Sequence, residues 1–177
     1  EAREFYLAVA PGIFKSTDGG QLWQPSNVGL SSMNIQQIFL SPGYEHDQTV
    51  FVDTWGSDGI YRSVDSGITW QPLDIELDQI VMSPEFDQDR TLIGSTGEKT
   101  LISRDGGTTW TNVTGNIPDL PPLGTVSNIE PSRYDAGSAY ITVDFHQMNN
   151  RDPFVYKTTD YGQSWKSLSS DIPKSVL

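Results

Sequence analysis

The chain has 177 residues and a mass of 19.6 kDa, the length of one domain at about 100–200 residues per domain. Its 23 acidic side chains outnumber the 11 basic ones, giving a formal net charge of −12, so we expect neither a nucleic acid nor an anionic membrane surface as partner. Cysteine is absent and only two histidines are present, which excludes disulfide scaffolds, cysteine-ligated zinc and thiol catalysis, and argues against a multi-histidine metal site.

Short β-rich runs separated by turns group into four blocks with approximate limits 1–30, 31–75, 76–120 and 121–177. The last three blocks each contain four predicted strands. The first block begins with a strand at 4–10 and lacks a counterpart of their first strand. No block leaves room for a helix of ordinary length. The strands of the complete blocks are predicted at 35–40, 49–54, 59–62 and 69–73; 79–82, 91–95, 99–102 and 109–113; and 126–130, 139–144, 154–157 and 164–168.

One turn pattern recurs between the third and fourth strands of every block. A Ser or Thr is followed by Asp two residues later, by Gly two residues after the Asp, and by Trp three residues after the Gly. Asp bonds backbone amides ahead of it, Gly tolerates a positive φ, and a buried Trp ring anchors the returning strand. We therefore expect structural roles for these residues rather than calcium binding or catalysis. The copies are Asp18, Gly20 and Trp23; Asp65, Gly67 and Trp70; Asp105, Gly107 and Trp110; and Asp160, Gly162 and Trp165.

The four copies resemble the Asp-box (BNR) repeat, S/T-x-D-x-G-x-x-W. That repeat occurs in sialidases, xyloglucanase-type glycosidases, the luminal domain of sortilin receptors and photosystem assembly factors. All of these are β-propellers in which the box joins the third and fourth strands of a blade. The resemblance implies an all-β propeller, or propeller segment, of about four four-stranded blades. It does not choose among those functions, because the shared residues are the structural ones.

The first blade is expected to lack its innermost strand, which leaves two alternatives. The chain is a segment of a longer propeller, or it pairs its open blade edges with a second copy as a homodimer. Unpaired edge strands invite association. The tail at 169–177 is a weak candidate for the missing strand, so we favour a fragment or an oligomer over a self-sufficient four-bladed monomer.

The candidate ligand-binding residues lie in irregular links, which the blade order places on one face, opposite the Asp boxes. The segment 144–153 carries carboxylates, an imidazole and a guanidinium that would suit a sugar or a peptide carboxylate; the alternative is a solvated loop. A tryptophan in the link of the second blade is either a sugar-stacking platform or part of the blade packing. The candidates are Trp55, Asp53, Asp58, Asp144, His146, Arg151 and Asp152.

The enzyme classes of the resemblance are tested by their residue requirements. Sialidases grip a carboxylate with three arginines, but four of the six arginines here fall in or beside Asp boxes or in the links of that same face, so we expect no sialidase activity. Xyloglucanase-type enzymes use two opposed carboxylates, and four of the candidate aspartates each qualify as half of such a pair. Photosystem assembly factors use a basic patch. The strongly acidic composition of this chain argues against that function.

We expect a non-catalytic binding or scaffold module that presents its loops to a glycan or a protein; the alternative is a fragment of a carbohydrate-active glycoside hydrolase. No apolar run approaches the about 20 residues of a membrane span, so we expect no membrane insertion. We expect an extracellular or periplasmic protein whose signal peptide is not in the chain. No cofactor is expected; calcium stays open because loops such as 87–89 are acidic, although none has EF-hand spacing.

Overall fold

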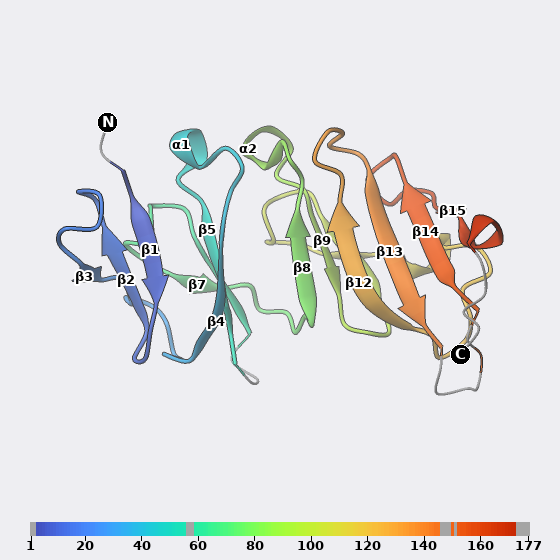
Figure 1. Ribbon diagram of the computed structural model, residues 1–177, viewed down its shortest axis with the longest axis horizontal. Coiled ribbons are helices and arrows are strands. Elements are labelled where there is room, and N and C mark those ends of the chain that lie inside the picture. The colour runs from blue at the N-terminus through green and yellow to red at the C-terminus, as the bar shows by residue number, and fades with distance from the viewer. Residues whose placement is uncertain (1–2, 56–58, 146–149, 151, 173–177) are drawn as a thin grey trace. The chain divides into compact units, whose positions relative to one another are not determined.

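The computed structural model describes residues 3–55, 59–145, 150 and 152–172, and it is all-β with only one-turn helices (Figure 1). The chain divides into two compact units, Glu1–Glu76 and Leu77–Leu177, which are taken in turn. Each unit contains two antiparallel sheets, and we number the four sheets as blades 1 to 4 in chain order. The division of 1–177 into a single region with the predicted blade limits stays a prediction.

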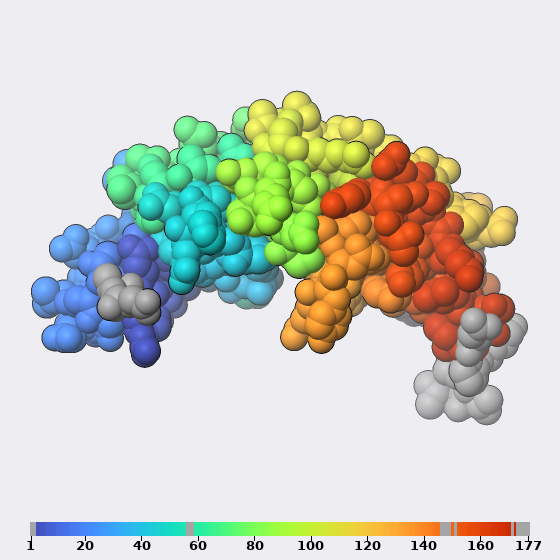
Figure 2. Space-filling model, turned by 90° about the horizontal axis from the view of Figure 1, so that it is seen from above, coloured from blue at the N-terminus to red at the C-terminus, as the bar shows by residue number. Residues whose placement is uncertain are grey.

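The first unit contains blades 1 and 2. Blade 1 has three strands in the order β1 (Phe5–Ala8), β2 (Ile13–Ser16) and β3 (Gln24–Pro25). Blade 2 has four, in the order β4 (Ile35–Leu40), β5 (Val50–Thr54), β6 (Ile60–Ser63) and β7 (Gln71–Pro72). The one-turn helix α1 (Tyr44–Asp47) joins β4 to β5. Figure 2, which views the structure from above, shows the face that carries α1.

The core of this unit lies between its two blades. Blade 2 contributes Val50, Val52, Tyr61 and Trp70, and blade 1 contributes Ile13 together with the half-buried Tyr6 and Leu30. Strand side chains alternate between the two faces of a sheet, so one face of blade 2 is buried by blade 1. The β-branched residues Val50 and Val52 and the aromatic Phe51 at the start of β5 suit such a position.

The second unit contains blades 3 and 4. Blade 3 has the order β8 (Gln79–Met82), β9 (Leu92–Ser95), β10 (Thr100–Ser103) and β11 (Thr111–Asn112), with the one-turn helix α2 (Phe86–Asp89) between β8 and β9. Blade 4 has the order β12 (Thr125–Pro131), β13 (Ala139–Asp144), β14 (Phe154–Thr158) and β15 (Lys166–Ser167). The short 3-10 turns η1 (Thr114–Asn116) and η3 (Ser169–Asp171) follow β11 and β15.

The core of the second unit also lies between its blades. From blade 3 come Ile93, Ile102, Val113 and Ile117; from blade 4 come Val126, Ile129, Ala139, Ile141, Val143, Tyr156 and Trp165. The two innermost strands are also bridged by the Gln79 side chain, which donates to the Ser127 carbonyl at 2.8 Å and accepts from the Ile129 amide at 3.2 Å. Packing between neighbouring blades therefore has the same character in both units.

The four recurrent turns share one hydrogen-bonding scheme. In blade 3 the Ser103 hydroxyl donates to the Asp105 carboxylate at 2.8 Å and accepts from the Gly107 amide at 2.8 Å. The same carboxylate accepts from the amides of Thr108 and Thr109, both at 2.9 Å, and from the Thr109 hydroxyl at 2.6 Å. Corresponding bonds occur at Asp18, Asp65 and Asp160.

These bonds shorten the outermost strands relative to the prediction. The strand expected at 69–73 pairs only over Gln71–Pro72, because the Thr69 amide is used by the Asp65 carboxylate at 2.9 Å. Proline has no amide hydrogen, so Pro72 donates no ladder bond. The expectation that each recurrent Trp buries its ring holds for Trp70 and Trp165, which are 3 % and 6 % exposed, whereas Trp23 is 38 % exposed.

Candidate ligand-binding site

A groove of about 420 Å³ lies in the first unit, at the end of β5. The Trp55 amide donates to the Asn34 carbonyl at 2.8 Å, which fixes the residue after β5 against the residue before β4. The Val9 amide donates to the Gly12 carbonyl at 3.0 Å and closes the turn between β1 and β2 beside them. The groove is lined by Ala8, Val9, Ala10, Met33, Asn34, Ile35 and Trp55.

The groove is lined mainly by apolar side chains and by one aromatic ring. Trp55 is 64 % exposed, and Val9 and Met33 are also exposed. The exposed side chain of Asn34 supplies amide donor and acceptor groups at the same place. Apolar and aromatic lining with few polar groups is typical of small-molecule sites. An exposed indole ring beside such groups suits a flat ligand with an apolar face, such as a sugar ring.

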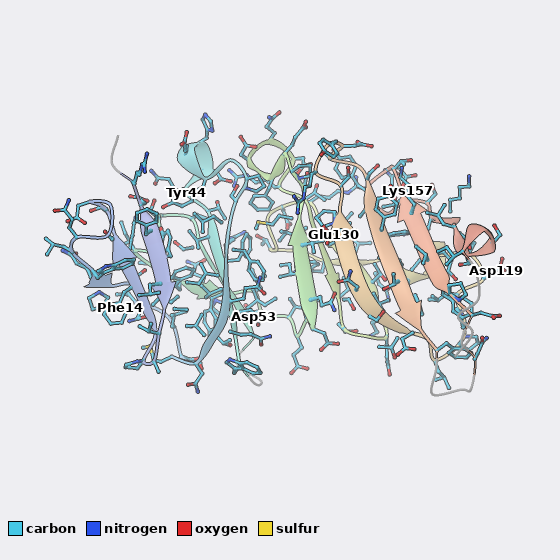
Figure 3. The ribbon with its side chains drawn as sticks, in the orientation of Figure 1. Phe14, Tyr44, Asp53, Asp119, Glu130 and Lys157 are labelled. Atoms are coloured by element: carbon cyan, nitrogen blue, oxygen red, sulfur yellow. The ribbon has the colours of Figure 1, made fainter. Side chains whose placement is uncertain are left out.

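The structure places Asp53 apart from this groove. It pairs with Gln37 on β4 and Ile60 on β6, and its position is labelled in Figure 3. It is half-buried, and this burial raises the pKa of its carboxyl, although a bond with the Thr54 backbone opposes the shift. Because side chains alternate along a strand, Asp53 shares a face of blade 2 with Phe51. It is not among the described residues that line the groove, and Asp58 lies outside the described residues.

The second predicted cluster belongs to blade 4. Asp144 ends β13 opposite Thr125 of β12, and Asp152 precedes β14, where its amide donates to the Asn150 side-chain oxygen at 2.9 Å. Both aspartates are half-buried. Beside them, the rings of Phe145 and Phe154 pack edge-to-face with centroids 6.2 Å apart. His146 and Arg151 lie outside the described residues. Among the residues that the structure describes, no group of three metal-ligating side chains occurs.

A polar cluster that no sequence motif indicates lies at the other end of β1. It includes Tyr44, which is labelled in Figure 3. Lys15 forms an ion pair with Glu4 at 3.0 Å, and Tyr44 donates to the same carboxylate. The hydroxyls of Tyr44 and Tyr6 share a hydrogen bond of 2.7 Å. Tyr6, Lys15 and Tyr44 come from β1, β2 and α1, and Glu4 precedes β1. Together these residues form no sequence motif. A cavity of about 680 Å³ lies beside them, lined by Arg3, Glu4, Phe5, Leu40, Tyr44, Glu45, Gln48 and Ser66.

The electrostatics of this cluster indicate a structural role. Burial raises the pKa of Glu4, but the hydrogen bonds from Tyr44 and Lys15 outweigh it, so the pKa lies below the usual value. Burial and the contact with Tyr44 raise the pKa of Tyr6. Lys15 also donates to the Ser66 carbonyl at 3.0 Å. The cluster therefore binds blade 1 to α1 and to the Asp turn of blade 2.

Comparison with known proteins identifies the fold. No family model matches the sequence, and no curated protein matches it. Solved structures do match. A GH74 enzyme of Niastella koreensis has a TM-score of 0.64 at 20 % identity over 94 % of this chain and 28 % of its own. The GH74 xyloglucanase of Xanthomonas campestris has a TM-score of 0.64 at 14 % identity, over 95 % of this chain and 28 % of its own. YCF48 bound to D1 peptide has a TM-score of 0.57 at 14 % identity, over 95 % of this chain and 50 % of its own.

The chain has a β-propeller fold. These neighbours are propellers, and the four antiparallel sheets correspond to propeller blades. The predicted all-β fold with about four blades is confirmed, and the described part of blade 1 has three strands. The chain spans about a quarter to a half of the length of these neighbours. None of the described helices is long and apolar enough to cross a bilayer.

Proposed function

We propose that this propeller segment binds an extended carbohydrate in the groove beside Trp55 without cleaving it. The observation that carries the proposal is the indole ring, which is 64 % exposed at a groove of about 420 Å³ with an apolar bed. Hydrolysis of a glycosidic bond requires a pair of carboxyl groups at a defined separation. The described residues that line this groove include no Asp or Glu. Binding is therefore the function that the groove supports.

The class of carbohydrate is suggested by the neighbours. One GH74 neighbour is a xyloglucanase, so we propose a β-linked glucan chain such as xyloglucan as the ligand. We further propose that the four recurrent turns are Asp-box (BNR) repeats and that the protein works outside the cytoplasm, where such polysaccharides occur. The acidic charge of −12 suits a neutral polymer better than an anionic one, because an anionic ligand would be repelled.

The proposal is tested by isothermal titration with xyloglucan oligosaccharides. Trp55→Ala is expected to weaken binding at least tenfold, since a stacked aromatic ring contributes about 1.4 kcal/mol or more. Trp55→Phe keeps a ring and should lose less. Tyr134→Ala is the matched control, because Tyr134 is a still more exposed aromatic residue in blade 4, and it should bind normally. Unchanged affinity in Trp55→Ala, or no binding by the native chain, would refute the proposal.

A second candidate is a part of a glycoside hydrolase, favoured by the half-buried Asp53 and by the GH74 neighbours. Burial raises the pKa of Asp53. A carboxyl that acts as general acid needs a raised pKa, because it must hold its proton until the reaction. This candidate predicts release of reducing sugar from xyloglucan by the native chain. That release should be lost in Asp53→Asn while oligosaccharide binding is kept. If no reducing sugar appears, the chain binds without catalysis.

A further inference from the structure

Blade 1 exposes a face whose counterparts in blades 2 and 4 are buried. Its strands place Phe5, Leu7, Phe14 and Trp23 on the face turned away from blade 2. Phe5 and Leu7 alternate with Tyr6, which packs against blade 2, and Leu7 pairs with Phe14 across β1 and β2. Phe5, Leu7 and Trp23 are 44 %, 45 % and 38 % exposed. We name these four residues the proximal face of blade 1.

The repeat shows what normally covers this face. The register aligns Phe5, Leu7, Phe14 and Trp23 with Val50, Val52, Tyr61 and Trp70 of blade 2, because Ser16 and Ser63 occupy the same position of the Asp turn. The blade 2 residues are at most 4 % exposed, and they pack on blade 1. The corresponding residues of blade 4 are Ala139, Ile141, Tyr156 and Trp165, which pack on blade 3. The proximal face of a blade is therefore built to receive another blade.

The indole groups of three recurrent tryptophans donate hydrogen bonds in two ways. In blade 2 the Trp70 indole donates to the Ser26 carbonyl of blade 1 at 2.8 Å, and the Ser26 hydroxyl donates to the Gly67 carbonyl. In blade 1 the corresponding Trp23 indole donates to the Gly20 carbonyl of its own turn at 3.1 Å, and in blade 3 the Trp110 indole donates in the same way to the Gly107 carbonyl at 3.1 Å. A bond within the turn is thus one of two arrangements of this donor, and the Trp70 bond shows the arrangement at a blade junction.

The chain carries the complementary surface on blade 4. The side of blade 1 that contacts blade 2 has Lys15 over the Tyr6 ring at 5.5 Å. In blade 4 the same register places Lys157 over the Tyr140 ring at 5.3 Å, on the face opposite the core residues Ile141 and Tyr156. Tyr140 is 37 % exposed. We name Tyr140, Lys157 and the exposed Ile172 the distal face of blade 4, and Figure 3 labels Lys157.

The connector after blade 4 repeats the one after blade 3. The 3-10 turns η1 and η3 have matching flanks, with φ and ψ of −112° and 10° at Val113 and −110° and 4° at Leu168. In blade 3 this connector is buried against blade 4. Val113 and Ile117 join the core, and the side-chain NH₂ group of Asn116 donates to the Gly162 carbonyl at 3.1 Å. At the corresponding place after blade 4, Ile172 is exposed.

We propose that two copies of this chain associate head-to-tail, with the distal face of blade 4 in one copy packed on the proximal face of blade 1 in the other. Lys157 would then donate to the Gly19 carbonyl of the second copy, as Lys15 donates to the Ser66 carbonyl at 3.0 Å between blades 1 and 2. The Leu168 carbonyl would accept from the Trp23 indole, as the Ser26 carbonyl accepts from Trp70. A second copy is the favoured occupant because this chain presents both halves of the junction. Such a heterologous contact uses two different surfaces of each copy.

The test is the solution mass by light scattering after size exclusion, at loadings up to about 100 µM. The native chain is expected to exceed 19.6 kDa. Leu7→Asp and Tyr140→Asp each place a charge in one half of the junction at a partly exposed side chain, and each should be monomeric when pure. Leu123→Asp is the matched control, since Leu123 is 80 % exposed in a loop of blade 4, and it should associate as the native chain does.

Mixing the two variants makes the test specific for a head-to-tail contact. Leu7→Asp keeps its blade 4 face and Tyr140→Asp keeps its blade 1 face, so an equimolar mixture retains one intact junction. The mixture should form a species of twice 19.6 kDa and nothing larger. A native chain that stays monomeric overturns the proposal. It would leave a further blade of a longer polypeptide as the occupant of the proximal face. Association that survives both substitutions, or a mixture that stays monomeric, overturns it as well. None of these masses depends on carbohydrate binding at Trp55.

Discussion

Replacing the turn aspartate of blade 3 should destabilise the second unit by an amount that can be worked out from its bonds. The Asp105 carboxylate accepts four hydrogen bonds, two from backbone amides and two from hydroxyls. Burial raises its pKa, but the hydrogen bonds from Thr109, Ser103 and Thr108 together outweigh this effect and lower the pKa to about 2. At about 0.5 kcal/mol for each exposed bond, Asp105→Ala should cost about 2 kcal/mol of unfolding free energy.

The isosteric change Asp105→Asn separates the charge from the bonds. A fall in the carboxyl pKa from 3.8 to about 2 corresponds to about 2.5 kcal/mol at about 1.4 kcal/mol per pKa unit. Because Asp105 is exposed, we expect solvent screening to reduce this to about 1 kcal/mol. A carboxyl whose folded pKa is depressed stabilises fully above its unfolded pKa. The native chain should therefore exceed Asp105→Asn in unfolding free energy by the whole of this amount at neutral pH. The difference in unfolding free energy should shrink as the pH falls from about 4 towards about 2.

The assay is urea unfolding followed by tryptophan fluorescence at neutral and at acidic pH. Glu98→Gln is the matched control, because Glu98 is an exposed carboxylate of the same blade and its substitution removes the same charge. The control should keep the native urea midpoint. If Asp105→Ala unfolds at the same urea concentration as Glu98→Gln, the carboxylate does not hold the turn. A loss in Asp105→Asn that is the same at both pH values would contradict the pKa argument.

Two further predictions concern the first unit. A Cβ at Gly29 would lie 2.1 Å from the Trp70 carbonyl oxygen at a φ of +98°, whereas one at Gly19 would meet nothing within 4 Å. Gly29→Ala should therefore prevent stable folding or cost about 3 kcal/mol or more, and Gly19→Ala about 1 kcal/mol; equal urea midpoints would refute the packing argument. Tyr44→Phe removes the hydroxyl that donates to Glu4 and should cost about 1–2 kcal/mol. It should also raise the pKa of Glu4, and an unchanged carboxyl titration by NMR would contradict the role given to Tyr44.

The strand pattern could be predicted because it depends on local chemistry. The predicted strands at 35–40, 79–82 and 139–144 match β4, β8 and β13 in both bounds, since alternation of apolar side chains needs only the nearby sequence. The outermost strands were predicted too long. Their first residues, such as Thr69, favour β-structure. However, the Thr69 amide donates to the carboxylate of the Asp turn instead of to a neighbouring strand. The strand propensity of a residue does not include this competing hydrogen bond.

The candidate site was predicted only in part. Trp55 stood out in the sequence as a tryptophan outside the recurrent turn, and the structure places it at a groove. Asp53 is near Trp55 in sequence but does not line that groove. Trp55 lies beyond the end of β5 at Thr54, so strand alternation does not bring the two side chains to one place. Likewise, the cluster of Glu4, Tyr44 and Lys15 could not be foreseen, since its members are distant in sequence and share no motif.

By itself, the sequence determined the repeat: about how many blades there are and where their turns lie. Short-range hydrogen bonds and side-chain alternation specify these features, and they act within about ten residues. Only the tertiary structure decided which faces are buried. The proximal face of blade 1 and that of blade 2 carry similarly apolar residues, yet one is exposed and the other is at most 4 % exposed. Burial depends on whether a neighbouring blade covers the face, and no local pattern contains that information.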